Sequence, residues 1–534
     1  MKQTRGFTRY IGFLTTAVIV CLLTTGCSQR IIDKPVFIVG GTVNHAGLTC
    51  NKEFEAVPSS VTNAQGDVEW FAGLGFGRMT FAKGDWSNWT GGPTASSLGF
   101  DVAETATGPG GLTMLTGDAW TTYSERKNLA FFSFIGRPPP EGGSSCVAVA
   151  ATTPEKLETQ DWDFPATCIS PSNGDQCAIL HIDQSNTFYA ACSFSDNGPS
   201  IRIQAFDNCI TAPGVANGCP RTAVTDIRGV NQLQFSIAEN PCTGNLVMTY
   251  RKGQDIRVRF YDENLTELGD SKVRGGQSFS VGQTNTGCTR GTIRRCGMGS
   301  ADCCNSKTKD CQTDTEGMCL RDNGRPSIDT YLTSSGGSQT CGAVIAYDSL
   351  VKGEDGNLWS KSRLDIVDIT SETSPVVKAQ WKSTSDQYAW NQYLSYAVVS
   401  DKGPNARRPK IGWFWLTDIR GACNVIAEGA TSINLGSTVQ ATGIISGPFP
   451  GVVTDSFGIG DYIRGIKGGD DDGSLYVSWG EPVTTSAAEC SSCMGDTWNL
   501  ATKISRIRWV STGKPGPETV VSPAPVVEGT FVDD

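Results

Sequence analysis

The chain has 534 residues and a formal net charge of −10, and only 18% of its residues are charged. Lys and Arg form no run, so the clustered cations that bind phosphate backbones are missing from the sequence, which argues against nucleic acid as a partner. The 62 glycines and 13 tryptophans, with few helix-favouring segments, predict an all-β protein.

Residues 1–26 have the features of an export signal. Lys2, Arg5 and Arg9 precede an apolar stretch, 11–23, which is shorter than the roughly 20 apolar residues of a spanning helix. A basic start, a short apolar middle and small residues before a cleavage point are typical of a secretory signal peptide.

The end of this segment, Leu22-Leu23-Thr24-Thr25-Gly26-Cys27, resembles the lipobox of bacterial lipoproteins, although Thr24 stands where that pattern usually has Leu. The resemblance implies that Cys27 is acylated, becomes the new N-terminus and holds the chain to a membrane. By analogy with Gram-negative lipoproteins, the non-acidic Ser28 implies sorting to the outer membrane. The alternative is an ordinary cleaved signal with an incidental cysteine.

The cysteine count fits an exported protein. Of 20 cysteines, Cys21 lies in the signal and Cys27 at its end, which leaves 18 that can pair completely. In an oxidising compartment these are expected to form disulfides. The two histidines, His45 and His181, lie far apart and have no ligand spacing, which disfavours zinc.

An internal repeat is the central feature of the sequence. Residues 201–207 and 256–262 both alternate apolar and polar side chains and end at an Asp that suits a turn. Each follows a more apolar strand and a turn, at 188–194 and 246–250. They are two copies of one antiparallel unit.

More copies follow at similar intervals. The apolar strands begin near six residues separated by 57, 58, 97, 68 and 64 positions: Phe131, Phe188, Leu246, Ala343, Ile411 and Leu475. The long interval contains an insertion, 286–324, with six cysteines: Cys288, Cys296, Cys303, Cys304, Cys311 and Cys319. Such a segment has no strand pattern and is expected to depend on three disulfides, for which 15 pairings exist.

A repeat of this length made only of strands predicts a β-propeller over 55–510, with six blades and a seventh copy at 69–86. Residues 27–54 are predicted to form a lipid-anchored linker, and 511–534 a C-terminal tail. The alternative architecture is two or three β-sandwiches in series, which would not require a uniform spacing.

The segment Ile459-Gly460-Asp461-Tyr462-Ile463, the turn Gly469-Asp470-Asp471-Asp472-Gly473 and the strand Leu475-Tyr476-Val477-Ser478-Trp479 together resemble the last blade of sialidase-like propellers of the Asp-box superfamily. The intact Asp-box itself is missing from the sequence. Sialidases hold a carboxylate with three arginines and use a Tyr paired with a carboxylate as nucleophile. The resemblance covers about twenty residues closely and implies the fold more strongly than the activity.

Arg464, Tyr462 and Arg325 lie near the starts of predicted inner strands, where they are candidates for ligand binding at the channel. No match places them on the sialidase motif, and the competing interpretation is that they are strand-surface residues. Catalytic residues are not assigned.

The acidic turn Asp470, Asp471 and Asp472 is a candidate calcium site, since clustered carboxylates in a glycine turn can ligate Ca²⁺. Asp and Gly also suit turns without any metal. Ca²⁺ is the only cofactor that the sequence suggests.

Trp413 and Trp415 alternate with Phe414 and so share one face of a strand. If that face is solvent-exposed, the two indoles can stack on sugars or peptides. If it is buried, they pack between blades.

Together these features predict an envelope lipoprotein whose propeller binds or scaffolds a glycan or protein ligand, and they favour a binding role over an enzymatic one. The alternative is a sialidase-like glycoside hydrolase acting on envelope or host glycans, and a third interpretation is a purely structural envelope component. Fold alone does not separate them.

Overall fold

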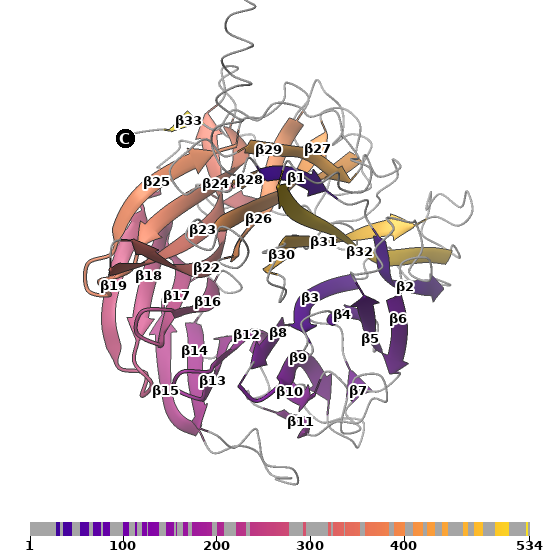
Figure 1. The fold of residues 1–534 in the computed structure, drawn as a ribbon, viewed down its shortest axis with the longest axis horizontal. Coiled ribbons are helices and arrows are strands. Elements are labelled where there is room, and N and C mark those ends of the chain that lie inside the picture. The colour runs from indigo at the N-terminus through magenta and orange to yellow at the C-terminus, as the bar shows by residue number, and fades with distance from the viewer. Residues whose placement is uncertain are drawn as a thin grey trace, which may run out of the picture.

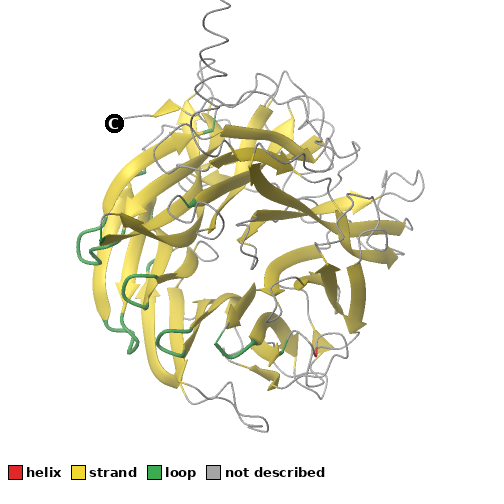
Figure 2. Ribbon diagram, viewed as in Figure 1, coloured by secondary structure: helices red, strands yellow, loops and turns green. Residues whose placement is uncertain are grey.

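The computed structural model shows an all-β chain whose sheets are arranged radially, as in a β-propeller (Figures 1 and 2). Backbone is described for the strands given below. Side chains are described for residues 120–124, 126–133, 148–153, 156, 177–193, 200–206, 222–230, 235–276, 326–334, 337–349, 361–383, 395–400, 409–415, 475 and 477. Within these residues, no helix has the length and apolar character needed to cross a membrane.

Four consecutive blades carry most of the described side chains, and in each the strands are antiparallel and follow chain order from the axis outward. The first comprises β12 (Gly174–Ile182), β13 (Thr187–Phe194), β14 (Ser200–Asp207) and β15 (Arg221–Arg228), and the second β16 (Phe235–Asn240), β17 (Asn245–Lys252), β18 (Asp255–Tyr261) and β19 (Glu267–Arg274). The third comprises β22 (Gly324–Ser335), β23 (Ser338–Lys352), β24 (Leu358–Asp368) and β25 (Val376–Lys382), with β33 (Thr530–Phe531) beside β25. The fourth comprises β26 (Ala389–Ser400), β27 (Lys410–Ile419), β28 (Asn424–Ser432) and β29 (Gln440–Ser446).

The remaining strands form two further sheets, one short ribbon and a closing sheet. One sheet comprises β3 (Phe54–Thr62), β4 (Val68–Gly75), β5 (Arg78–Asp85) and β6 (Phe100–Thr105). The next comprises β7 (Thr113–Met114), β8 (Trp120–Ser124), β9 (Leu129–Arg137), β10 (Cys146–Thr152) and β11 (Phe164–Cys168). The ribbon pairs β20 (Thr292–Arg294) with β21 (Cys319–Arg321) inside the predicted insertion.

The closing sheet contains strands from both ends of the chain. β30 (Ile463–Lys467), β31 (Leu475–Val483) and β32 (Thr497–Ser511) come from the C-terminal part. β1 (Ser28–Ile32) and β2 (Val36–Asn44) pair with successive halves of β32, with Ser28 opposite Ser511 and Asn44 opposite Thr497. The segment predicted as a linker therefore supplies the outer strand of this sheet (Figure 1).

The predicted repeat corresponds to the second strand of each sheet. The six apolar segments that define the spacing lie in β9, β13, β17, β23, β27 and β31. The two alternating segments that revealed the repeat are β14 and β18, the third strands of adjacent blades, and the copy at 69–86 is the β4–β5 hairpin. The regular spacing therefore corresponds to radial sheets, and the alternative of stacked sandwiches is wrong.

Alternation along the strands builds a separate core between neighbouring blades in the part of the chain whose side chains are described. In β18, Ile256, Val258 and Phe260 are fully buried against the blade β22–β25. The opposite face of β17 and β18, with Leu246 and Tyr261, packs on the blade β12–β15. Because both faces of the blades β12–β15, β16–β19 and β22–β25 are covered by neighbouring blades, these blades need no helical layer.

Side chains on the innermost strands also bind the backbone of the next blade. Thr122 Oγ1 in β8 accepts a hydrogen bond from the His181 amide in β12 at 3.3 Å. Asp329 Oδ2 in β22 accepts one from the Val399 amide in β26 at 2.8 Å, and Ser327 Oγ accepts one from the Ala397 amide at 3.0 Å. In both hydrogen bonds between β22 and β26 the two residues are 70 positions apart in sequence, which shows that these strands run parallel.

The propeller therefore has two distinct faces. The innermost strands end on one face, which carries the turns 126–128, 183–186 and 241–244, and we call it the clamp face. The innermost strands begin on the opposite face. We call it the insertion face, because the connection that contains the insertion leaves β19 there and enters β22 there.

Removal of residues 28–44 is expected to open the ring, because β32 then loses its partners along one entire edge. We expect the thermal midpoint of a chain beginning at residue 46 to fall well below that of a chain beginning at Ser28. Each backbone hydrogen bond between these strands contributes a net ~0.5 to 1 kcal/mol, so the free energy of unfolding is expected to fall by more than about 3 kcal/mol.

A synthetic peptide of residues 28–44 added to the shortened chain is expected to restore the midpoint by strand addition. A scrambled peptide of the same composition serves as control. Equal midpoints for the two chains would show that the closing pairs contribute nothing.

Candidate functional site: a clamp between two blades

A disulfide joins two blades that are separated by the insertion. Cys242 lies in the turn between β16 and β17, and Cys341 lies near the start of β23 in the next blade. Their Cα atoms are 5.9 Å apart although they are 99 residues apart in sequence. The loop that this bond closes contains the whole segment 286–324.

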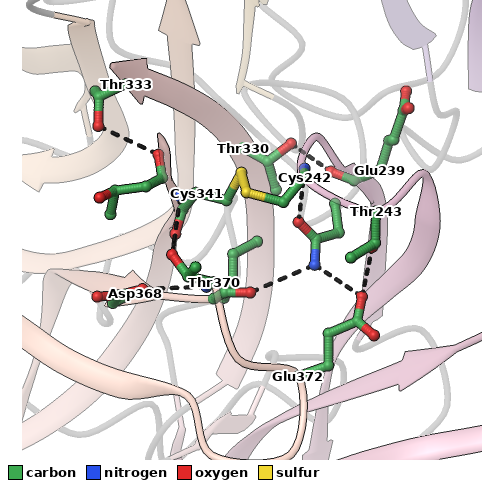
Figure 3. The surroundings of a disulfide bond; sticks show 12 residues. Glu239, Cys242, Thr243, Thr330, Thr333, Cys341, Asp368, Thr370 and Glu372 are labelled. Atoms are coloured by element: carbon green, nitrogen blue, oxygen red, sulfur yellow. Dashed lines mark hydrogen bonds between the residues drawn. A yellow bond between two sulfur atoms is a disulfide. The ribbon is translucent and has the colours of Figure 1, made fainter. Parts of the chain in front are cut away.

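The carboxylate of Glu372 reinforces this connection. Glu372 lies in the turn between β24 and β25 and reaches back to the turn that carries Cys242 (Figure 3). Its Oε1 accepts hydrogen bonds from Asn240 Nδ2 at 2.8 Å, from Thr243 Oγ1 at 2.6 Å and from Asn245 Nδ2 at 3.1 Å. Asn245 Nδ2 also donates to Oε2, at 3.0 Å.

Side-chain oxygens also accept hydrogen bonds from the backbone amides of both disulfide cysteines. Asn240 Oδ1 accepts from the Cys242 amide at 3.1 Å, and Thr370 Oγ1 accepts from the Cys341 amide at 3.0 Å. Thr330 Oγ1 donates to the Glu239 carbonyl across the two innermost strands at 2.6 Å. We refer to the disulfide and the Glu372 hydrogen bonds as the clamp.

One glycine makes the clamp geometrically possible. A Cβ atom at Gly269, in β19, would lie 2.2 Å from the carbonyl oxygen of Glu372. Only glycine allows the backbone of the turn to approach β19 so closely. The clamp therefore depends on close contact between the turn 369–375 and β19 of the preceding blade.

A second polar cluster lies farther out on the blade β16–β19. Arg257 Nε donates to Asp270 Oδ1 at 2.9 Å, and Tyr250 donates its hydroxyl proton to Asp270 Oδ2 at 2.9 Å. Arg259 Nη2 donates to the Tyr250 hydroxyl at 2.9 Å, and its Nη1 lies 3.1 Å from Glu267 Oε2. The cluster is half-buried.

This cluster has the residue types of a sialidase site but not its chemistry. Burial raises the pKa of Tyr250 to about 12, so its phenol stays protonated at neutral pH and is not activated as a nucleophile. Although burial opposes ionisation, hydrogen bonds from Arg257 and Arg259 lower the pKa of Asp270. The two arginines already hold a carboxylate, and they lie on the third strand of the blade, away from its innermost strand.

A Ser, an Asp and a His meet between the blades of β8 and β12. The Ser124 hydroxyl donates to Asp183, and Asp183 Oδ1 lies 3.0 Å from His181 Nδ1. Because the carboxylate lies between the other two, the imidazole cannot take a proton from the serine. His181 is buried and stacks on Phe131 at 5.5 Å, and burial lowers its pKa to about 4.

A buried carboxylate lies between the second and third blades described above. Asp365, in β24, is fully buried and accepts a hydrogen bond from the Tyr347 hydroxyl at 2.9 Å. Burial raises the pKa of Asp365 to about 6, and the charges of Arg274 and Arg363 oppose this rise. It is a structural acid inside an inter-blade core.

The structure gives the backbone position of two of the residues predicted to bind a ligand, Arg464 and Arg325. Arg464 is the second residue of β30 and Arg325 the second residue of β22, so both lie at the insertion-face ends of innermost strands. The side chains of both, together with Tyr462 and the proposed calcium ligands Asp470–Asp472, lie outside the described residues. Within the described part, no three His, Cys, Asp or Glu side chains are grouped to hold a metal.

Trp413 and Trp415 pack between blades and do not form a ligand-stacking surface. They are 1% and 0% exposed and lie in the core shared by the blades β22–β25 and β26–β29. Their ring centroids are 4.9 Å apart, and Trp413 Nε1 donates to Ser362 Oγ at 2.7 Å. The exposed-face interpretation of these two residues is thereby corrected, because the face they share is the buried one.

The sequence reasoning missed the clamp. Cysteine counting predicted disulfides, and Cys177–Cys192 and Cys242–Cys341 occur among the described residues, but no sequence signal relates Cys242 to Cys341. Glu372 is an ordinary polar residue in a turn, and its partners lie about 130 residues earlier. Only the ring arrangement brings them together.

No protein-family model matches the sequence, and a search of curated proteins finds no relative. Among solved structures, an arginine-to-alanine mutant of AofleA from Arthrobotrys oligospora is similar at 11% identity over 74% of this chain and 87% of that chain, with a TM-score of 0.35. The Dos1 propeller is similar at 8% identity over 85% and 94%, with a TM-score of 0.31. The α-L-arabinanase of Cellvibrio cellulosa is similar at 9% identity over 60% and 94%, with a TM-score of 0.29. Similarities this weak support no conclusion about activity, and the fold rests on the sheets themselves.

Replacing Glu372 with Gln is expected to destabilise the protein by about 1 to 3 kcal/mol. The substitution replaces one carboxylate oxygen with an amide NH2 group that faces the Asn245 donor, and it removes the negative charge from the hydrogen bonds made by Asn240 and Thr243. Chemical denaturation followed by tryptophan fluorescence measures the loss.

Glu263→Gln is the matched control, because Glu263 is an exposed carboxylate in the corresponding turn of the preceding blade. We expect it to change stability by less than about 0.5 kcal/mol. If both variants unfold alike, Glu372 does not brace the two blades.

His181 and Asp365 are expected to give opposite pH dependences of stability. The pKa of His181 falls from 6.5 to about 4 on folding, so its contribution is present above pH 6.5 and is lost as the pH falls toward 4. The pKa of Asp365 rises from 3.8 to about 6, so its contribution is present below pH 3.8 and is lost as the pH rises toward 6. In the intact chain the two largely cancel.

Single variants separate them. Between pH 4 and 6.5, the stability of Asp365→Asn relative to the unchanged chain should rise by about 3 kcal/mol, and that of His181→Phe should fall by about 3 kcal/mol. Urea unfolding at several pH values measures both. Parallel curves for the two variants would contradict the opposite signs.

Proposed function

We propose that the chain is an exported lipoprotein of the cell envelope, acylated at Cys27 and held to the outer membrane, whose β-propeller binds or scaffolds a glycan or protein ligand. The proposal needs no catalytic residue and no resident cofactor, apart from Ca²⁺ at Asp470–Asp472 as a candidate structural ion.

The observation that carries this proposal is the use of carboxylates as braces between blades. Asp329 accepts from the backbone of the next blade, and Glu372 accepts from the turn of the preceding one. Asp348 Oδ1 in β23 likewise accepts from Ser395 in β26, from its amide at 3.1 Å and from its hydroxyl at 2.7 Å. Acids fixed in this way rigidify a platform and are not free to transfer protons.

The disulfides support the extracytoplasmic location. A bond between Cys242 and Cys341 that joins separate blades is stable only where thiols are kept oxidised. Together with the signal-like residues 1–26, this favours export over a cytosolic role.

The proposal includes seven blades. The innermost strands contact one another in the order β3, β8, β12, β16, β22, β26 and β30, and β30 contacts β3. The sheet β3–β6 at the predicted seventh copy and the closing sheet both fit into this ring.

Binding and hydrolysis are tested on one preparation, the chain beginning at Ser28 with its disulfides intact. A glycan array and an array of envelope proteins should give saturable binding, and a panel of fluorogenic glycosides should give no turnover. Turnover that is lost in Arg464→Ala or Arg325→Ala would replace the binding proposal with the hydrolase alternative.

The lipid is tested separately on the full chain. Radiolabelled palmitate should be incorporated, and Cys27→Ser should abolish both the label and membrane partition. A membrane-bound Cys27→Ser protein would contradict anchoring through this residue.

A further inference from the structure

The N-terminal strand fixes where a lipid anchor would emerge from the propeller. Ser28 is the first residue of β1 and pairs with Ser511, the last residue of β32. Cys27 is one peptide bond away, which is about 3.8 Å between Cα atoms. A lipid on Cys27 would therefore be attached directly to the closing sheet, with no flexible tether.

The direction of β32 shows which face carries this end. β32 is the third strand of the closing sheet and ends beside the start of β31, since Ile507 is opposite Leu475. The start of β31 follows the end of β30, an innermost strand, and innermost strands end on the clamp face. Ser28 and Ser511 thus lie on the clamp face.

The insertion enters and leaves on the other face. The last residue of β19, Arg274, is opposite Ile256, next to the turn between β17 and β18. Gly276 donates its amide proton to Asp255 in that same turn at 3.1 Å. At the other end of the connection, Gly324 begins β22 on the same face.

We infer that the anchored propeller rests with its clamp face toward the membrane and presents the two ends of the insertion, together with the strand ends that carry Arg325 and Arg464, away from it. This inference rests on the proposed lipid at Cys27. Ligands approach from the insertion face, and the clamp face, where the blades are braced, is covered by the bilayer surface.

Two turns of one blade provide matched reporters. The turn 252–255 lies on the insertion face and the turn 262–266 on the clamp face, and both are formed by β18 and its neighbours. An epitope tag is inserted after Gly253 in one variant and after Glu263 in the other. Each tagged protein is prepared as the full acylated chain on phospholipid vesicles and as a free chain beginning at Ser28.

Binding of an anti-tag Fab is then measured on both forms. For the tag after Glu263, we expect anchoring to weaken Fab binding at least tenfold. For the tag after Gly253, anchored and free proteins should bind alike. Equal access to both tags on vesicles, or the reverse pattern, would overturn the inferred orientation.

A chain beginning at Cys27 and coupled through that thiol to a maleimide lipid repeats the measurement without cellular acylation. If the cell does not acylate Cys27, only the proposed anchoring fails, and the coupled protein still tests the orientation. If acylation occurs but both tags are equally accessible, the anchoring stands and the orientation fails. Thermal midpoints of the free tagged chains confirm that each insertion leaves the fold intact.

Discussion

Ring closure is the constraint on which this structure depends. The described blades β12–β15, β16–β19 and β22–β25 are apolar on both faces and need a neighbour on either side, so an open row of such blades would leave two apolar surfaces in water. The chain closes the row by pairing β1 and β2 from its N-terminal part with β32 from its C-terminal part. The inter-blade cores, the braces and the buried tryptophans follow from that closure.

Local patterns predicted much of this architecture because second strands are the most regular part of each blade. Their near-continuous apolar residues, as in β13 and β23, are imposed by burial on both faces. The outer strand of the closing sheet was instead predicted as a linker, although 36–39 is apolar. Its partner β32 lies more than 450 residues away, and no local pattern reveals a pairing over that distance.

The candidate site was harder to predict than the fold for the same physical reason. Asn240, Cys242 and Glu372 are ordinary turn residues in sequence, and their significance arises only from the contact between two turns. Trp413 and Trp415 show the converse. Alternation placed them correctly on one face, but whether that face meets solvent or another blade depends on the neighbouring sheet.

The position of the clamp can be understood from chain entropy. The connection from β15 to β16 has 6 residues, 229–234, whereas the connection from β19 to β22 has 49, 275–323. Because the entropy cost of closing a loop grows with its length, the roughly eightfold longer connection weakens the docking of the two blades by about 2 kcal/mol. In the chain-entropy model, a disulfide that closes a loop of about 100 residues lowers the entropy of the unfolded chain and so stabilises the folded state by about 4.7 kcal/mol. This more than offsets the weaker docking. The clamp therefore lies at the junction with the longest connection, where the chain itself contributes least to holding two neighbouring blades together.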